Sequence, residues 1–361
     1  MSDPRQSPLH DLHVEAGASF TDFAGWLMPV RYSSDLAEHH AVRTAAGIFD
    51  ISHMAEIRVT GPDAAAFLDF ALAGLISAVK LGKAKYSLIL EESGGILDDL
   101  IVYHDREAEY YVVANAGNRD VVVAALQDRS AGFDVAVTDL TDEVVLIAVQ
   151  GPNARDIVAA VVDLPELTYY SAAYAGDVLV ARTGYTGEDG YELYVAVEDA
   201  APLWRALVAA GASHGLVPAG LASRDTLRLE AGMPLYGHEL DRSHTPVDAG
   251  LGVLAATKSK DAFIGRDAIV AAKKNGAAQK LVGLKGDGRR AARAGYTVLT
   301  SDDKEVGEVT SGALSPTLGY PVAMAYVDAD VAEPGTALSV DIRGKHYPYT
   351  VVQLPFYKRD R

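Results

Sequence analysis

Up to about residue 275, the chain alternates between apolar runs at strand spacing and apolar stripes at helix spacing. The runs 49–61 and 141–151 each end at a glycine that is followed by proline, as strands often do before a turn. Ser34 is placed to cap a helix that would stop at Gly47. The predicted helices are 33–47, 63–75, 153–162 and 198–210, and the predicted strands are 49–61, 141–151 and two strands around a glycine-rich turn within 177–197. This part of the chain therefore predicts α+β architecture.

The pattern changes after about Gly276. Short apolar runs separated by turns follow one another closely, at 280–299, 305–312, 320–327 and 336–344. Such spacing predicts a separate all-β module, a small antiparallel barrel at the C-terminus. We expect the boundary within 273–280.

Length, charge and composition narrow the possible functions. A chain of 361 residues predicts two or three domains. Its formal charge of −17 argues against binding nucleic acid or an anionic membrane surface. The N-terminus is polar, and no apolar run reaches the ~18 residues of a membrane span. The absence of cysteine excludes disulfides and thiolate sites, and we expect a cytoplasmic protein.

Two adjacent aspartates, Asp98 and Asp99, stand in the otherwise apolar run 96–103. Buried carboxylates are expensive, so their presence needs a reason. Alternation along a strand puts them on opposite faces, which argues against a pair of carboxylates serving one pocket. Either one of them caps a turn or pairs with an arginine at the start of the strand, or one faces a ligand. The spacing does not say which.

Two further segments could line a site. The turn 182–194 has three glycines and three acids but lacks a phosphate-binding or calcium-binding pattern, so it is an ordinary hairpin or a pocket wall that stacks a ring. Arg224 and Arg228 share one face of a predicted helix. They are ion-paired arginines or an anion clamp, which an acidic protein would need. The histidines, among them His53, follow no metal-binding pattern, and we expect no metal.

Seven segments, in order along the chain, closely resemble the T-protein family, the aminomethyltransferases of the glycine cleavage system. They are 23–32, 41–54, 85–103, 149–154, 182–193, 222–241 and 309–327. Several long motifs in the right order are far more specific than any one short pattern.

The resemblance implies a three-domain cloverleaf around a central hole that binds folate. The expected domains are 1–52 with 139–275, then 53–138, then the barrel 276–361. It also implies a reaction in which the aminomethyl group on the dihydrolipoyl arm of the H-protein reacts with tetrahydrofolate. The products would be ammonia, 5,10-methylenetetrahydrofolate and the dihydrolipoyl H-protein. Tetrahydrofolate would be a co-substrate, and lipoylated H-protein the partner.

The resemblance also assigns residues. Asp99 would be catalytic, with its carboxylate bonded to folate N10, and Asp98 would be structural. Glu192 would recognise the amino-pyrimidine edge of the pterin. The other folate-binding residues would be Tyr86, Tyr103, Asn115, Tyr185 and Arg224.

Two surface expectations and two rival functions stay open. The basic stretch 285–295 is a solvated turn or a docking site for an acidic H-protein, and Lys358 and Arg359 could act near its arm. The chain could instead be a folate-dependent demethylase or a non-catalytic folate-binding paralogue. The relative used in iron–sulfur assembly carries a cysteine motif that this chain lacks.

Overall fold

The computed structural model describes residues 3–359. They form two compact units, the first made of 3–87 and 100–225 and the second of 88–99 and 226–359. The chain crosses between the units inside β6 (Lys83–Leu90), β7 (Ile96–Arg106) and α7 (Leu221–Glu230). The α+β class is confirmed, and the division into three domains stays a prediction. Within 3–359, no helix is both long and apolar enough to cross a membrane.

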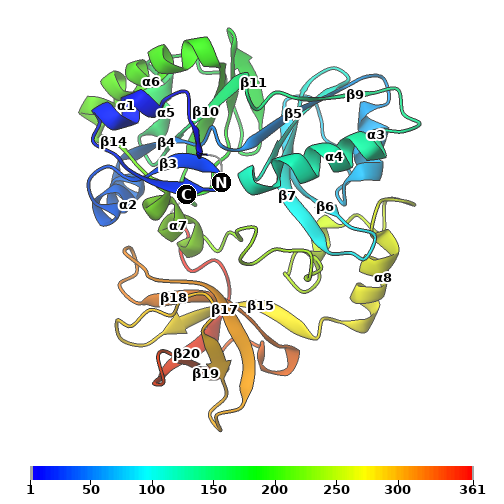
Figure 1. Cartoon of the computed structure of the whole chain (residues 1–361), viewed down its shortest axis with the longest axis vertical. Coiled ribbons are helices and arrows are strands. Elements are labelled where there is room, and N and C mark those ends of the chain that lie inside the picture. Colours follow the sequence, from blue (N-terminus) through cyan, green and yellow to red (C-terminus); the bar gives the residue numbers. More distant parts are fainter. Residues whose placement is uncertain (1–2, 360–361) are drawn as a thin grey trace. The chain divides into compact units, whose positions relative to one another are not determined.

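The first unit contains a six-stranded sheet, antiparallel except where β14 joins β4. Its order is β11 (Ala172–Ala175), β12 (Val178–Ala181), β13 (Gly190–Ala196), β10 (Val144–Gln150), β4 (Ala46–Asp50) and β14 (Leu216–Pro218). Helices α1 (His10–Glu15), α5 (Ala154–Ala159) and α6 (Val197–Gly211) pack their apolar side chains on this sheet (Figure 1). The predicted apolar stripe of α6, Leu203, Trp204 and Leu207, is buried there.

The first unit also contains most of a second sheet, which has five strands. Its order is β6, β7, β8 (Glu109–Ala114), β5 (Ala55–Thr60) and β9 (Ala136–Asp139). Helices α3 (Ala64–Ala71) and α4 (Arg119–Arg129) pack against each other. A small sheet near the N-terminus joins β1 (Arg5–Gln6), β3 (Trp26–Arg31) and β2 (Ser19–Phe23), and α2 is Asp35–Thr44.

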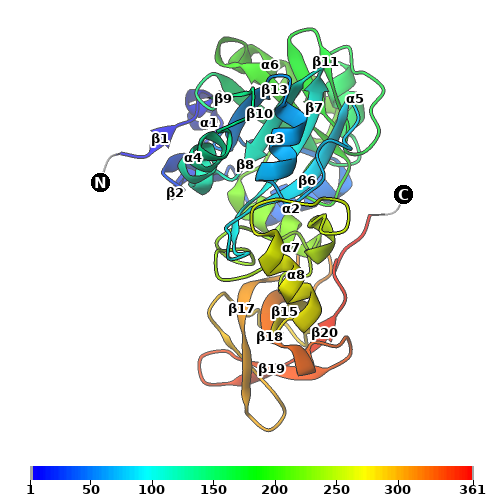
Figure 2. The same cartoon turned by 90° about the vertical axis from the view of Figure 1, so that its right-hand side faces the viewer.

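The second unit contains the predicted barrel, which is closed and confirms the sequence expectation. Its strands, in order, are β15 (Gln279–Gly286), β18 (Pro321–Asp328), β17 (Glu305–Leu314), β16 (Thr297–Leu299), β19 (Ala337–Asp341) and β20 (His346–Val352), and most are labelled in Figure 2. Valine, leucine and alanine side chains fill its interior. Helix α8 (Arg266–Asn275) precedes it, and Gly276 ends that helix with a φ of +79°.

Two local predictions were wrong, one because of tertiary packing and one because of a local turn. Ser34 does cap α2, through a bond from the Ala37 N–H, but the helix ends at Thr44. Gly47 lies inside β4, where a Cβ would sit 2.5 Å from Val42 Cγ2, so glycine is needed for close packing and not as a helix stop. The run 49–61 is not one strand, because the Asp50 carboxylate accepts the Ser52 N–H and shapes a turn between β4 and β5.

Candidate functional site

Glu192 is the central polar group of the first unit. It lies on β13, buried between Ala148 of β10 and Ala181 of β12. Its Oε2 accepts hydrogen bonds from Thr183 and, at 3.4 Å, from the hydroxyl of Tyr103 on β7. Burial raises the pKa of Glu192, while the Thr183 bond and the nearby charge of Arg224 oppose that rise. The two sheets of this unit therefore meet at a carboxylate with two donors and a nearby cation.

Arg224 lies in the first turn of α7 and faces the same region. Its guanidinium carbon is 4.8 Å from the ring centroid of Tyr185, a cation–π contact. Burial lowers the pKa of Arg224, and the charge of Glu192 raises it. Both Arg224 and Tyr185 keep some accessible surface, whereas Glu192 is buried. The structure thus brings together three of the predicted ligand residues and, through its bond to Glu192, a fourth, Tyr103.

The acids of the turn 182–194 differ in their partners. Glu188 is paired with the buried Arg43 at 2.9 Å, and Asp189 is paired with Arg182 at 2.6 Å. The first ion pair joins the turn to helix α2, and the second joins the two sides of the turn, so these two carboxylates hold the turn in place. Glu192 is the acid of this group that faces the tyrosines and Arg224.

Glycines let the same turn close on Gln150 at the end of β10. A Cβ on Gly184 would lie 2.0 Å from Gln150 Oε1, and one on Gly190 would lie 2.4 Å from Nε2. Gln150 also donates to the Thr183 carbonyl at 3.1 Å and accepts from the Thr186 hydroxyl at 3.0 Å. The turn is therefore a packed wall, which favours the pocket-wall interpretation over an ordinary exposed hairpin.

His53 is a polar residue of this region that sequence reasoning left without a role. It lies in the turn between β4 and β5, buried and edge-on to Phe23, with ring centroids 5.3 Å apart. Burial, followed by the charge of Arg224, lowers the pKa of His53 to about 4. A neutral imidazole beside Arg224 leaves the arginine charge available to an anionic or electron-rich ligand.

The two aspartates of β7 have different environments. Asp98 is completely buried and Asp99 is partly exposed, as expected of neighbours on opposite faces of a strand. Asp99 follows the tight turn at Gly94 and Gly95, and a Cβ on Gly95 would lie 2.1 Å from the Arg242 carbonyl oxygen. The start of β7 belongs to the second unit and is thus packed against another backbone segment of the same unit.

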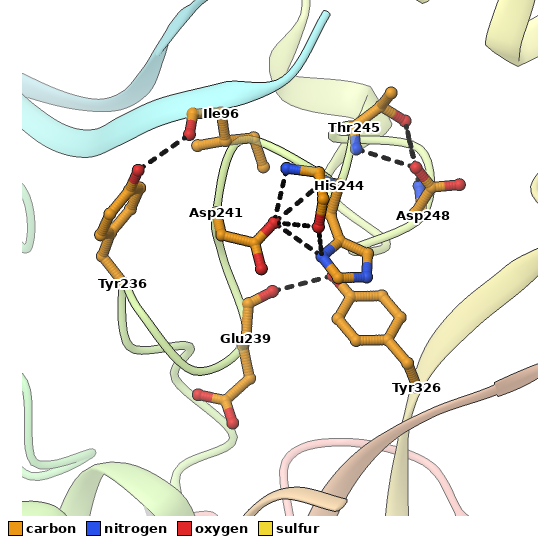
Figure 3. Close-up of polar contacts among 9 residues, drawn as sticks. Ile96, Tyr236, Glu239, Asp241, His244, Thr245, Asp248 and Tyr326 are labelled. Carbon is orange, nitrogen blue, oxygen red and sulfur yellow. Dashed lines mark hydrogen bonds and ion pairs between the residues drawn. The ribbon is translucent and has the colours of Figure 1, made fainter. Parts of the chain in front are cut away.

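That segment is 236–248, here called the brace (Figure 3). The Ile96 N–H donates to the carbonyls of Asp241, at 3.1 Å, and His244, at 3.2 Å. The Tyr236 hydroxyl donates to the Ile96 carbonyl at 3.2 Å. Burial, followed by the charge of Asp98, raises the pKa of Tyr236. The brace therefore fixes the strand that carries both aspartates.

The brace is in turn attached to the barrel. The His244 ring stacks on Tyr326 of β18, with centroids 3.8 Å apart and planes 9° apart, and the Tyr326 hydroxyl donates to the Glu239 carbonyl at 2.8 Å. Glu239 pairs with the buried Arg228 at 2.8 Å. Arg228 is therefore an ion-paired structural arginine and not half of an anion clamp. Only residues 236–241 of the brace lie in a segment that resembles the family, and nothing in the composition of 236–248 indicated this role.

Two predicted ligand residues and the metal expectation complete the description. Tyr86 lies on β6 and Asn115 follows β8, both partly exposed, and their proposed contacts with folate stay predictions. Within residues 3–359, no group of three or more histidine and acidic side chains could hold a metal ion.

Comparison with known proteins covers the whole chain. The GCVT N-terminal domain family matches residues 9–259, and the glycine cleavage T-protein C-terminal barrel domain family matches residues 279–358. The aminomethyltransferase of Corynebacterium jeikeium is 57% identical and that of Bacillus subtilis 42% identical, with at least 98% of each chain covered. The crystal structure of glycine cleavage system aminomethyltransferase T from Bartonella henselae has 39% identity, a TM-score of 0.94 and 98% coverage of both chains.

Proposed function

The chain belongs to the glycine cleavage T-protein family, and from that premise we propose that it moves a methylene carbon from H-protein to tetrahydrofolate. The donor is the aminomethyl group on the dihydrolipoyl sulfur of H-protein. The carbon–sulfur bond and the carbon–amine bond break, and bonds from carbon to folate N5 and N10 form. Ammonia leaves, and the lipoyl arm is released as a dithiol. Family membership and the names of its relatives support a transferase of this kind.

The observation that carries the proposal is the environment of Glu192. The amino-pyrimidine edge of a pterin presents neighbouring N–H donors, and a buried carboxylate held in a fixed orientation is a suitable acceptor. Thr183 and Tyr103 fix one oxygen of Glu192, and Arg224 keeps a positive charge nearby. We assign Glu192 to the pterin edge, and Tyr185, stacked with Arg224, to the wall beside the ring.

Asp99 is the proposed catalytic residue. A carboxylate bonded to folate N10 can orient that nitrogen and stabilise positive charge as the methylene bridge closes. The brace holds the start of β7 through backbone bonds to Ile96, so Asp99 projects from a fixed strand. No protein nucleophile is required, because the folate nitrogens attack. Much of the rate gain would then come from positioning the two substrates.

The remaining assignments concern the rest of the folate site and the contacts with H-protein. Tyr86, Tyr103 and Asn115 are proposed to complete the folate site, and Tyr103 has the added role of holding Glu192. Lys285, Arg289, Arg290 and Arg293 of the basic stretch are exposed, which suits docking of an acidic H-protein. Lys358 and Arg359 are proposed to act near its arm. Cytoplasmic location stays a sequence-based prediction.

A direct assay tests the reaction. Aminomethylated H-protein and tetrahydrofolate are mixed with the enzyme, and ammonia and 5,10-methylenetetrahydrofolate are measured. We expect both products in equal amounts and only when H-protein is lipoylated. Tetrahydrofolate binding without turnover would reject the transferase and support a non-catalytic paralogue. Turnover with a small methylated sulfur or oxygen donor in place of H-protein would support a demethylase.

A further inference from the structure

Three tyrosines lie between two buried glutamates inside the first unit. The Tyr194 hydroxyl donates to the Tyr103 hydroxyl at 3.1 Å, and Tyr103 donates to Glu192. The Tyr194 ring packs edge-on against Tyr111, with centroids 5.3 Å apart, and the Tyr111 hydroxyl donates to Glu56 Oε2 at 2.7 Å. We call Tyr103, Tyr111 and Tyr194 the tyrosine layer. It connects Glu192, the proposed pterin acceptor, to a second carboxyl group, Glu56.

Strand register puts these groups on facing surfaces of the two sheets. Tyr111 of β8 is opposite Tyr103 of β7 and Arg58 of β5, and Glu56 is two residues before Arg58, so all four share one face. Glu192 and Tyr194 are likewise two residues apart on β13 of the other sheet. The two glutamates are therefore held in one polar layer between the sheets.

The carboxyl groups of Glu192 and Glu56 have very different hydrogen-bond partners and neighbouring charges. Glu192 has two hydrogen-bond donors and the charge of Arg224. Glu56 has one donor, Tyr111, and among residues 3–359 its Oε1 has no hydrogen-bond partner although it is fully buried. An ionised carboxylate with a bare buried oxygen is strongly disfavoured, and a protonated one much less so.

Other charged groups near Glu56 do not compensate a negative charge on it. Asp139 of β9 and Glu192 of β13 are both acidic and both disfavour ionisation of Glu56. The guanidinium of Arg58 lies 4.7 Å from the Tyr111 ring centroid but is bonded to Asp105 at 2.7 Å. Asp139 is paired with Arg119 at 2.7 Å, so that arginine is also engaged.

We propose that Glu56 is a positioning residue for Glu192, a carboxylic acid that stays protonated so that the tyrosine layer carries one negative charge, located at the ligand. This rests on the proposed function only in taking the ligand to be tetrahydrofolate. Burial raises the pKa of Glu56 to about 8; the Tyr111 bond opposes the rise, and Asp139 and Glu192 add to it. Of the two buried carboxyl groups, Glu192 is the one with two hydrogen-bond donors and a nearby cation to hold a negative charge at the ligand.

The proposal predicts a specific pH dependence of binding. An ionised Glu56 would place a second negative charge in the layer and disfavour the charge on Glu192, so affinity falls once Glu56 loses its proton. For one group with a pKa of about 8, tetrahydrofolate should bind roughly tenfold more weakly at pH 9 than at pH 7. Glu56→Gln keeps the shape without the titration, and its affinity should be unchanged at pH 7 and nearly constant to pH 9.

A second variant tests the hydrogen bond between Tyr111 and Glu56. The Tyr111 bond lowers the pKa of Glu56, so Tyr111→Phe should move the loss of affinity to higher pH. A purely structural Glu56 would not respond in this way. Equilibrium titrations with tetrahydrofolate at several pH values measure both effects. An identical pH profile in wild type and Glu56→Gln, or loss of binding by Glu56→Gln at pH 7, would overturn the proposal.

Unfolding gives a readout that needs no ligand. Because the pKa of Glu56 is raised on folding from 4.5, its contribution to stability is fully present below about pH 4.5 and is lost as pH rises through about 8. Glu56→Gln should therefore gain stability relative to wild type between pH 5 and 8. Absence of this gain rejects a protonated Glu56. Failure of wild type to bind tetrahydrofolate at any pH would instead reject the proposed function and with it the ligand role of Glu56.

Discussion

The surroundings of Glu192 and those of Asp99 are built in opposite ways. Around Glu192, the hydroxyls of Thr183 and Tyr103 and the charge of Arg224 act directly on a buried carboxylate. Around Asp99, the strand is fixed at the backbone of Ile96, by two carbonyls and the Tyr236 hydroxyl of the brace, and by the absence of a side chain at Gly95. We infer that the first region sets affinity through electrostatics and the second sets the position of a reacting group through shape.

This difference predicts which property, ligand binding or stability, is lost when each region is altered. Changes to side chains of the tyrosine layer should alter ligand binding and its pH dependence while leaving the fold intact. Changes to the backbone fit of the brace, or to its anchors, should destabilise the second unit. The predictions below run from the largest expected effect to the smallest.

Loss of the brace's ionic anchor should have the largest effect. Arg228 is buried and bonded to Glu239, the Met233 carbonyl and Ser311. Replacing it in Arg228→Met leaves the Glu239 carboxylate buried without its cation, which should lower the free energy of unfolding by about 3–5 kcal/mol. Denaturant unfolding measures this. The control is Arg155→Met, whose partner Glu166 is exposed, so that solvent screens the pair and little change is expected. Equal effects would contradict the anchoring role.

A methyl group at Gly95 tests the backbone fit directly. Gly95→Ala places a Cβ against the Arg242 carbonyl oxygen, and the shift required should lower the free energy of unfolding by about 1–3 kcal/mol. It should also reduce turnover, since Asp99 is four residues further along the chain. Gly252→Ala is the matched control in the same unit, because its Cβ meets other atoms at 3.6 Å or more. A stable, fully active Gly95→Ala would refute the brace.

Removing one hydroxyl from the tyrosine layer should weaken the binding of tetrahydrofolate. Tyr103→Phe deletes the donor to Glu192 and the acceptor for Tyr194. A hydrogen bond to a charged group contributes about 1.5–3 kcal/mol, so tetrahydrofolate should bind about 10-fold or more weakly. Calorimetric titration measures the affinity, and the melting temperature checks the fold. Unchanged affinity would mean that Tyr103 does not support Glu192.

The contact between His244 and Tyr326 should be the least sensitive. The His244–Asp241 pair is partly exposed, so its charge contributes below about 1 kcal/mol. His244→Phe keeps a ring stacked on Tyr326 and should change unfolding little, whereas His244→Ala should cost about 0.5–1.5 kcal/mol more by losing the stack. Equal stability of the two variants would show that the stack does not attach the brace.

Features that depend on neighbouring residues could be predicted from the sequence, and features that depend on tertiary contacts could not. The cap at Ser34 and the change of pattern before the barrel depend on neighbouring residues and could be predicted. The role of Gly47 depends on Val42 packed across from it, and the pattern alone misassigned it.

The candidate site shows the same limit. Alternation correctly separated Asp98 from Asp99, but only the resemblance distinguished Glu192 from Glu188 and Asp189. Their different partners, such as Arg43 from α2, come from distant parts of the chain. The roles of the brace and of Glu56 could not be predicted, because each role depends on contacts between segments that are far apart in the sequence.

The central claim is that Glu192 binds the ligand and Asp99 acts in the reaction. The most direct test compares Asp99→Asn with Glu192→Gln for both tetrahydrofolate affinity and turnover with aminomethylated H-protein. Asp99→Asn should bind within about threefold of wild type but turn over roughly 10²–10⁴-fold more slowly, the range for a proton-handling or charge-stabilising group. Glu192→Gln should lose affinity first. A fully active Asp99→Asn, or one that fails mainly by losing tetrahydrofolate, would contradict this division of roles.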